Sequence, residues 1–358
     1  MKKIVIGIDI SKEKIDASAI DVRNTQQGVQ KLDYQTFENR QMGFYRMLIW
    51  ARNLIKGVSL EEILFCCETT GGYDRKLCDY IYAKGLFIWR EGALQINRSM
   101  GVRKGKDDKA DSLMIAEYAM RHMDKAVNYE TPRQAIRELK ELLLYRHKLV
   151  QEKIEKKVRM SHLADTAPKS KAMSFILRDA RKSIKALDKS IKLCEQQIHE
   201  IIKEDEELAS NYAHITSIKG IGIVNATALI AYSNNFKGIS SPNKMASYYG
   251  IAAFRKTSGS SVDKKAYVKC YSNSLLKAYL TQAAEWTIRE KGIYHGYYQR
   301  LKKNGKPYGI IINNARNKLI HLVYSLIENN TDYEQNHEFL RAEKKSEQIK
   351  SAQLKNIN

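Results

Sequence analysis

Four acidic residues have the chemistry and the positions expected of ligands for a divalent metal ion. Asp108 and Asp111 are three residues apart, so a helix that starts here presents both carboxylates on one face. Two like charges this close repel each other, and a cation between them removes the penalty. Asp9 and Glu68 each follow an apolar run typical of a buried strand. We therefore predict that these four carboxylates hold Mg²⁺ through oxygen ligands.

Two alternatives concern the acidic stretch itself. Acidic residues are favoured at a helix N-terminus by the helix dipole, which explains such a cluster without a metal. Asp107 directly precedes Asp108 and is a rival for the third ligand, although the three-residue step to Asp111 favours Asp108.

The elements that must position these acids follow the order of an RNase H-like (RuvC-like) α/β domain over residues 1–130. In such a sheet the first and fourth strands lie side by side, which brings Asp9 and Glu68 toward the acidic helix. The predicted strands are residues 4–10, 15–19, 32–37, 63–67 and 86–89, and the predicted helices are residues 40–56, 73–83 and 111–122.

A strand that ends in Gly-Ile-Asp-Ile-Ser, as residues 7–11 do, also opens the sugar-kinase and actin-like ATPase fold. That fold carries a second phosphate-binding loop later in the chain, and the sequence contains none. The positive charge is also unusual for a kinase of small molecules. These two observations disfavour the kinase interpretation.

The composition favours a nucleic-acid partner. The 358 residues carry a formal net charge of +21, and the 61 Lys and Arg residues are spread along the whole chain. The five cysteines form no spaced ligand pair and are interpreted as reduced core residues. No signal peptide and no hydrophobic span are recognised, so we expect a cytoplasmic protein without a membrane partner.

Residues 131–212 are predicted to form a long coiled-coil hairpin. Apolar residues recur in residues 133–163, and more regularly at steps of three and four through residues 174–208. Asp205 occupies a step that should be apolar, so the seam is expected to fray there. The tip is placed at residues 164–171. A helix pair this thin usually needs a partner, which predicts self-association; a purely intramolecular hairpin is the alternative.

Residues 213–330 are predicted to form a mostly helical domain that contacts nucleic acid. Lys219, Gly220 and Gly222 lie in a helix-hairpin-helix pattern, in which backbone N–H groups meet phosphate. Downstream, a Ser-Gly-Ser-Ser stretch lies among basic residues that could offset phosphate charge. Tyr248 and Tyr249 are alternative candidates for the nucleophile. A flexible polar loop without a catalytic role is the other interpretation of the Ser-Gly-Ser-Ser stretch. The basic residues around the Ser-Gly-Ser-Ser stretch, which are predicted to bind nucleic acid, are Arg255, Lys256, Lys264 and Lys265. Residues 331–358 are expected to be a disordered polar tail.

These motifs together resemble the insertion sequence one-ten family of transposases, over about residues 3–330. The resemblance rests on residues 7–9, 68–73, 106–111, 218–222, 249–251, 258–259 and 305–306. It implies a DEDD metal site at Asp9, Glu68, Asp108 and Asp111, and a nucleophilic serine at Ser258, with Ser260 and Ser261 as neighbours open to misassignment. It also implies donor and target DNA selected by a bridge RNA. The self-association predicted from the coiled coil would give a dimer or a dimer of dimers.

The mechanism that the resemblance implies is strand cleavage and rejoining through a phosphoserine, with Mg²⁺ stabilising the phosphate charge. Two other functions remain open on the residues alone. One is a RuvC-like nuclease that hydrolyses DNA without a covalent intermediate, and the other is a non-catalytic nucleic-acid-binding protein.

Overall fold

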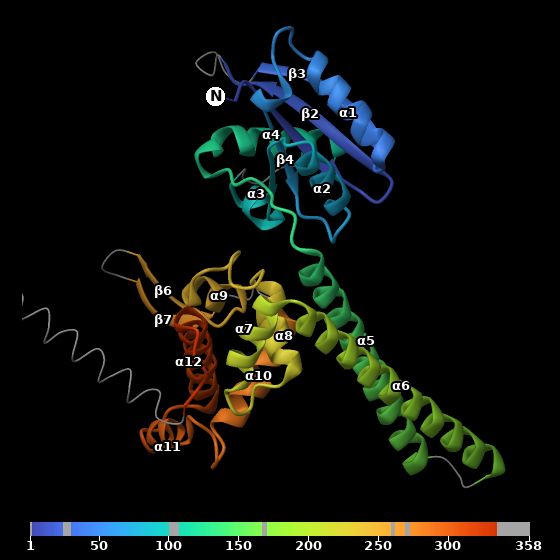
Figure 1. Ribbon diagram of the computed structural model, residues 1–358, viewed down its shortest axis with the longest axis vertical. Helices are drawn as coiled ribbons and strands as arrows, with labels where there is room; N and C mark the ends of the chain where they lie inside the picture. The colour runs from blue at the N-terminus through green and yellow to red at the C-terminus, as the bar shows by residue number, and fades with distance from the viewer. Residues whose placement is uncertain are drawn as a thin grey trace, which may run out of the picture. The chain divides into compact units, whose positions relative to one another are not determined.

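The computed structural model describes residues 2–23, 30–99, 107–166, 170–258, 262–268 and 273–334, with the backbone alone for residues 254–258 and 262–268. The chain divides into two compact units, Met1–Thr131 and Pro132–Asn358. Each unit is described by itself below (Figure 1).

The first unit is built on a five-stranded mixed sheet with strand order β3-β2-β1-β4-β5. The first three strands form an antiparallel meander, and β4 and β5 are added in parallel beside β1. This order and these directions define an RNase H-like domain, as predicted from the sequence. The elements are β1 (Ile4–Ile10), β2 (Lys14–Asp21), β3 (Gln30–Glu38), α1 (Gln41–Asn53), β4 (Ile63–Glu68), α2 (Arg75–Ala83), β5 (Ile88–Glu91), α3 (Ala93–Ser99) and α4 (Asp108–Arg121), with single 3-10 turns at Leu60–Glu62 and Met123–Lys125.

Helices cover both faces of this sheet, because its strands are apolar on both sides. Ile4, Ile6 and Ile8 of β1 pack in one core cluster with residues of α1 and α2. Val5, between them in the sequence, packs in a second cluster with residues of α3 and α4. Successive side chains of a strand point to opposite faces, so the odd-numbered positions of β1, including Asp9, lie on the α4 face.

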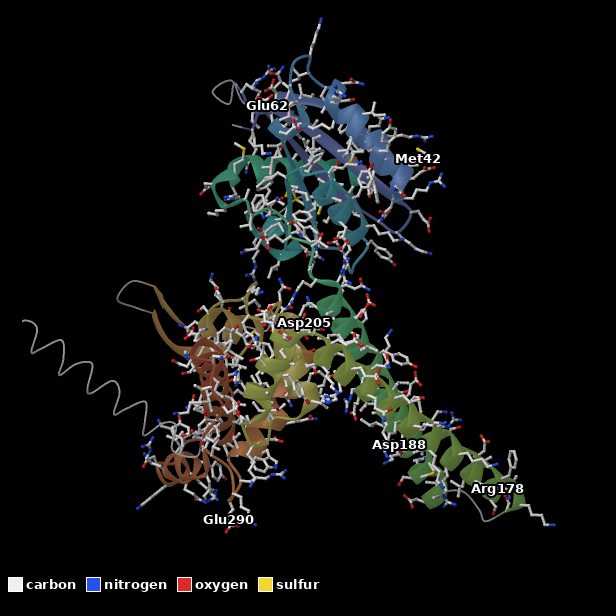
Figure 2. The ribbon with its side chains drawn as sticks, in the orientation of Figure 1. Met42, Glu62, Arg178, Asp188, Asp205 and Glu290 are labelled. Carbon is white, nitrogen blue, oxygen red and sulfur yellow. The ribbon has the colours of Figure 1, made fainter. Side chains whose placement is uncertain are left out.

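The second unit begins with a helical hairpin. Its two helices are α5 (Gln134–Thr166) and α6 (Lys171–Glu204). Ion pairs join Lys153 to Asp188 and Arg146 to Glu195, so the residue numbers fall along one helix as they rise along the other. The two helices are therefore antiparallel (Figure 2).

Asp205 interrupts the hairpin where the sequence predicted fraying. It is the N-cap of α7, and its carboxylate accepts a hydrogen bond of 3.0 Å from the backbone N–H of Leu208. Arg133 pairs with the same carboxylate at 2.8 Å, which ties the start of α5 to the end of α6. The predicted continuous helix 174–208 is thus wrong at its end, because the cap starts a new helix (Figure 2).

The rest of the second unit is helical around one core, except for a two-stranded β-hairpin. Residues of α5 and α6 near Asp205 contribute to the same core as α8, α10 and α12. The elements are α7 (Glu206–Thr216), α8 (Ile223–Tyr232), α9 (Pro242–Tyr248), β6 (Ala253–Ser258), β7 (Val262–Val268), α10 (Ser274–Thr287), α11 (His295–Lys303) and α12 (Tyr308–Asn329). The predicted tail reaches the described residues only at 331–334 and otherwise lies outside them, as do the hairpin-tip residues 167–169.

Cys66, Cys67, Cys78 and Cys194 are buried and free, as predicted for these four core cysteines, and Cys270 lies outside the described residues. Within the described ranges, no helix has the length and apolar character needed to span a bilayer.

Candidate functional site

Four acidic residues of neighbouring strands form a line across the sheet on the α4 face: Asp16, Asp9, Glu68 and Glu91. Asp9 of β1 pairs directly with Asp16 of β2. The parallel pairing of β1 with β4 ends at Ile8 and Cys67, so Asp9 and Glu68 are the next residues of the two adjacent strands. Glu68 in turn pairs with Glu91 of β5. The sequence predicted Asp9 and Glu68, whereas Asp16 and Glu91 were missed, and the strand register is what reveals them.

The two acids of α4 approach this line because α4 lies directly on β1. A Cβ added to Gly7 would lie 2.1 Å from the backbone nitrogen of Ala116 and 2.3 Å from the carbonyl oxygen of Ser112. The Ser112 hydroxyl also lies 2.8 Å from the hydroxyl of Ser18 on β2. Glycine at position 7 therefore permits the contact that brings the first turn of α4 over the sheet.

The pKa of Asp9 is raised above its ordinary value. Burial of the carboxyl group is the largest cause, followed by the charge of Asp111. The carboxylates of Asp108 and Asp16 raise the pKa of Asp9 further, and the backbone hydrogen bond with Ile10 opposes them. The structure therefore brings carboxylates from β2 and the first turn of α4 near Asp9, and their negative charges disfavour its ionised form.

Asp108, rather than Asp107, is the α4 residue that faces this cluster. Asp107 is the exposed N-cap of the helix, and its carbonyl oxygen accepts the backbone N–H of Asp111 at 2.9 Å. Asp108 is half-buried and contributes to the raised pKa of Asp9. This geometry agrees with the three-residue spacing that favoured Asp108.

Lys14, a residue that the sequence did not single out, supplies a cation at the edge of the cluster. Its Nζ lies 2.6 Å from Asp108 Oδ2 and 3.1 Å from Asp16 Oδ2. Asp16 is 2 % exposed, and its other oxygen accepts hydrogen bonds from Thr36 at 2.6 Å and Tyr34 at 2.7 Å. Burial raises the pKa of Asp16, but these hydrogen bonds and that of Lys14 outweigh it, so the pKa is lowered overall. Asp16 therefore stays ionised and anchors Lys14.

The residues present fit a divalent cation by their donor chemistry. Carboxylate oxygens are the ligands that Mg²⁺ prefers, and the repulsion that raises the pKa of Asp9 is what a bound cation would relieve. Among the described residues, however, no three His, Cys, Asp or Glu side chains converge closely enough to hold a metal ion.

Glu91 is held by neighbours on the same face. Its carboxylate accepts hydrogen bonds from Tyr118 of α4 at 3.2 Å and from the backbone N–H of Gly92 at 2.7 Å. Burial, with the charge and hydrogen bond of Glu91, raises the pKa of Tyr118 to about 12. The Tyr118 hydroxyl therefore remains a hydrogen-bond donor, and these contacts restrain Glu91 at the end of the acidic line.

The Gly-Ile-Gly turn joins α7 to α8, and packing explains one of its glycines. Gly220 has φ +103°, and a Cβ there would lie 2.5 Å from the Trp286 ring. Lys219 lies over the same ring, 5.7 Å from its centroid. An added Cβ at Gly222 meets no described atom within 4 Å. Phosphate contact by Lys219, Gly220 and Gly222 stays a prediction.

The predicted nucleophile lies on a β-hairpin that the sequence did not predict. Ser258 is the last residue of β6 and pairs with Val262, the first residue of β7. Ser260 and Ser261 lie outside the described residues. Lys256 pairs with Lys264 across the hairpin, so positive charge recurs on both strands. Arg255 and Lys265 also belong to these strands, and their role in nucleic-acid binding stays a prediction.

Two family models match successive parts of the chain. A model of DEDD transposases of the IS110 family, described as "Transposase", matches residues 6–168. A second model, described as "Transposase IS116/IS110/IS902 family", matches residues 212–299, which include the serine hairpin.

Two curated relatives extend over nearly the whole chain. Pilin gene-inverting proteins of Moraxella lacunata and Moraxella bovis are each 25% identical over 340 residues, covering 93% of this chain and 98% of the relative. Among solved structures, Thermus thermophilus RuvC in complex with a Holliday junction substrate is 12% identical, with a TM-score of 0.27; the match covers 35% of this chain and 99% of RuvC.

Proposed function

Because this chain belongs to the IS110 family of transposases, we propose that it cleaves and rejoins DNA strands with Ser258 as the nucleophile. The observation that carries the proposal is the approach of the α4 carboxylates to Asp9, which supports a role in phosphate chemistry for the first unit over that of a plain binding surface. The family resemblance assigns the serine, and its position on a strand among basic residues suits attack on a charged phosphodiester.

The proposed reaction conserves the number of phosphodiester bonds. The Ser258 oxygen attacks the phosphorus while the bond from phosphorus to a deoxyribose oxygen breaks. The serine proton passes to a carboxylate or to solvent, and the leaving oxygen takes up a proton. A second strand's hydroxyl then attacks the phosphoserine and releases the serine. A divalent cation held by Asp9, Glu68, Asp108 and Asp111 would neutralise phosphate charge when bound.

Guidance by a bridge RNA is part of the same proposal. Base pairing would select donor and target DNA, so the protein would need to hold nucleic-acid backbones rather than read many bases. The net charge of +21, with basic residues in every part of the chain, supports such contacts.

Self-association through the helical hairpin is also proposed. Near Asp205 the hairpin residues Ile198 and Ile202 are buried, whereas Val158 and Phe175, toward the opposite end, are 64 % and 60 % exposed. Exposed apolar side chains on a thin helix pair favour a second copy as partner. Val158→Glu combined with Phe175→Glu should lower the mass measured by sedimentation equilibrium. An unchanged mass would restrict the hairpin to an intramolecular role.

The decisive experiment is to trap a protein–DNA adduct that survives denaturation and to map the attached residue by mass spectrometry. Attachment at Ser258 supports the proposal, and Ser260→Ala and Ser261→Ala serve as matched controls from the same segment. A Ser258→Ala protein that still cleaves DNA would establish a hydrolytic nuclease. Nucleic-acid binding without cleavage by the wild-type protein would establish a non-catalytic binder.

The acids and Ser258 belong to different compact units, so a mixture of inactive chains tests how they cooperate. We propose that the two act on one phosphate from different copies of the chain. Mixing Asp9→Ala protein with Ser258→Ala protein should then restore recombination. No recovery in a mixture shown to form mixed oligomers would argue for action within one copy.

A further inference from the structure

An amide-rich cavity lies beside the start of the serine hairpin. It has a volume of about 540 Å³ and is bounded by α9, the segment 251–253 and α12. Ala253, one of its lining residues, is the first residue of β6, the strand that ends at Ser258. Its polar lining residues are Asn243, Lys244, Ser247, Asn313, Asn314 and Asn317.

Among the described residues, a hydrogen bond within the fold accounts for one of the four asparagines that line the cavity. Asn313 donates a hydrogen bond of 2.9 Å to the carbonyl oxygen of Ile251, which fixes the segment between α9 and β6. Asn314 and Asn317 are half-buried, and within the described part of the chain neither makes a side-chain hydrogen bond. Asparagine is a poor helix former, yet Asn313, Asn314 and Asn317 all lie in the interior of α12. No described side chain occupies the amides of Asn314 and Asn317, which leaves them available to a ligand as far as the described residues extend.

The remaining lining residues indicate the class of that ligand. Ala246, Ile251 and Ala252 provide an apolar surface on which a flat ring can lie. Amide groups both donate and accept hydrogen bonds, and asparagine pairs with the edge of a nucleobase. Lys244 is exposed at the cavity, and its described lining contains no Asp or Glu, which favours a neighbouring phosphate.

We propose that this cavity binds a base of the DNA strand close to the phosphate that Ser258 attacks, with Lys244 on the backbone. From Ala253 to Ser258 the chain advances five residues, at most about 17 Å of extended strand. That length corresponds to about five nucleotides of a stacked strand. The inference rests on the proposed function, because Ser258 defines which part of the DNA lies nearby.

Binding of the full-length protein to fluorescent 20-nucleotide DNA strands of each base, and to an abasic strand, tests this assignment. The double variant Asn314→Ala, Asn317→Ala should bind at least one natural strand about five-fold more weakly or worse, and the abasic strand equally well. Lys244→Ala should weaken binding to every strand, including the abasic one, and lower the salt dependence by about one counterion. Asn329→Ala is the matched control, since Asn329 lies on the same helix and bonds to the Ser325 carbonyl oxygen.

An isosteric change keeps the test meaningful if the alanine variant is unstable. Asn317→Asp retains the shape of the side chain but adds a negative charge to the acid-free lining, so it should also reduce binding to natural strands. Equal losses on natural and abasic strands, or no loss, would overturn the proposal. A loss confined to RNA strands of the same length would overturn the assignment to DNA. Failure to trap an adduct at Ser258 would instead overturn the proposed function and leave base-dependent binding as a separate result.

Discussion

The Nζ of Lys14 lies 2.6 Å from Oδ2 of Asp108, a residue 94 positions later in the chain. This ion pair joins the first residue of β2 to the first turn of α4. Asp16, buried and hydrogen-bonded by Tyr34 and Thr36, holds the same ammonium group from the sheet side. A lysine is therefore part of the acidic site, and it places positive charge beside Asp16 and Asp108.

Lys14→Met should strengthen metal binding. Without the ammonium group, Asp16 and Asp108 lose a compensating charge, and a divalent cation experiences less repulsion. One unit charge about 4 Å from a divalent cation in water contributes about 2 kcal/mol, which corresponds to a roughly thirty-fold change in affinity. Calorimetric titration of DNA-free protein with Mg²⁺ measures this change, and Lys14→Arg should behave as wild type. Weaker binding by Lys14→Met would instead show that Lys14 positions Asp108 for the metal.

Gly7→Ala should destabilise the first unit by about 2 kcal/mol or more, because an added methyl group overlaps the backbone of α4 at Ser112 and Ala116. The helix must move away from β1, which also displaces Asp108 and Asp111. Urea denaturation followed by circular dichroism measures the loss. Gly92→Ala is the matched control, since a Cβ there meets no described atom within 4 Å. Equal stability of the two variants would contradict the close approach.

The sheet and most of the acidic site were predictable because short apolar strands carry a strong signal. The apolar runs at residues 4–10 and 63–67, with Asp9 near the end of the first and Glu68 directly after the second, indicate both the strands and the end of the sheet at which these two acids lie. Asp16 and Lys14 were not found, because each looks like an ordinary surface residue in the sequence. Their importance depends on the pairing of Asp9 with Asp16, which only the register between β1 and β2 reveals.

The second unit was less predictable because local patterns there have two interpretations. The segment around Ser258 is rich in small and basic residues, typical of a flexible loop, whereas the structure pairs β6 with β7. Asp205 looks like a defect in a heptad seam, but its carboxylate begins α7. Helix α3, at residues 93–99, has too few residues for a reliable periodic pattern and was missed.

Asp9→Asn should stabilise the metal-free protein at neutral pH. Burial and the charge of Asp111 raise the pKa of Asp9, so the folded state binds this proton more tightly than the unfolded state does. Stability contributed by this proton is present below the ordinary Asp pKa of 3.8 and is lost as the pH rises through the raised value. The neutral amide avoids that loss.

Thermal unfolding in EDTA at several pH values checks this prediction. The variant should melt a few degrees above wild type at pH 7, and the two should converge at a pH below the ordinary Asp pKa. Adding Mg²⁺ at pH 7 should stabilise wild type more than Asp9→Asn, since the amide is a weaker ligand. A variant that is less stable than wild type at pH 7 in EDTA would contradict the unrelieved repulsion at Asp9.

Tyr249→Phe should leave DNA cleavage and adduct formation intact. Tyr249 is 1 % exposed, and burial raises the pKa of its hydroxyl well above the ordinary value. Its oxygen is buried and has no hydrogen-bond partner among the described residues, so nothing there takes up the proton that a nucleophile must lose. Removing an unpaired buried hydroxyl should also stabilise the protein by on the order of 1 kcal/mol.

Tyr248→Phe provides the exposed counterpart, since Tyr248 is 41 % exposed and its ring packs against Tyr232 and Tyr249. Both tyrosine variants should yield wild-type amounts of denaturation-resistant adduct on gels, whereas Ser258→Ala should yield none. Because the phenylalanine variants keep the packing of the rings, a lost adduct would come from the hydroxyl and not from a damaged fold. If either tyrosine variant loses the adduct while Ser258→Ala remains active, the nucleophile is that tyrosine at the end of α9 and not Ser258 of the β-hairpin.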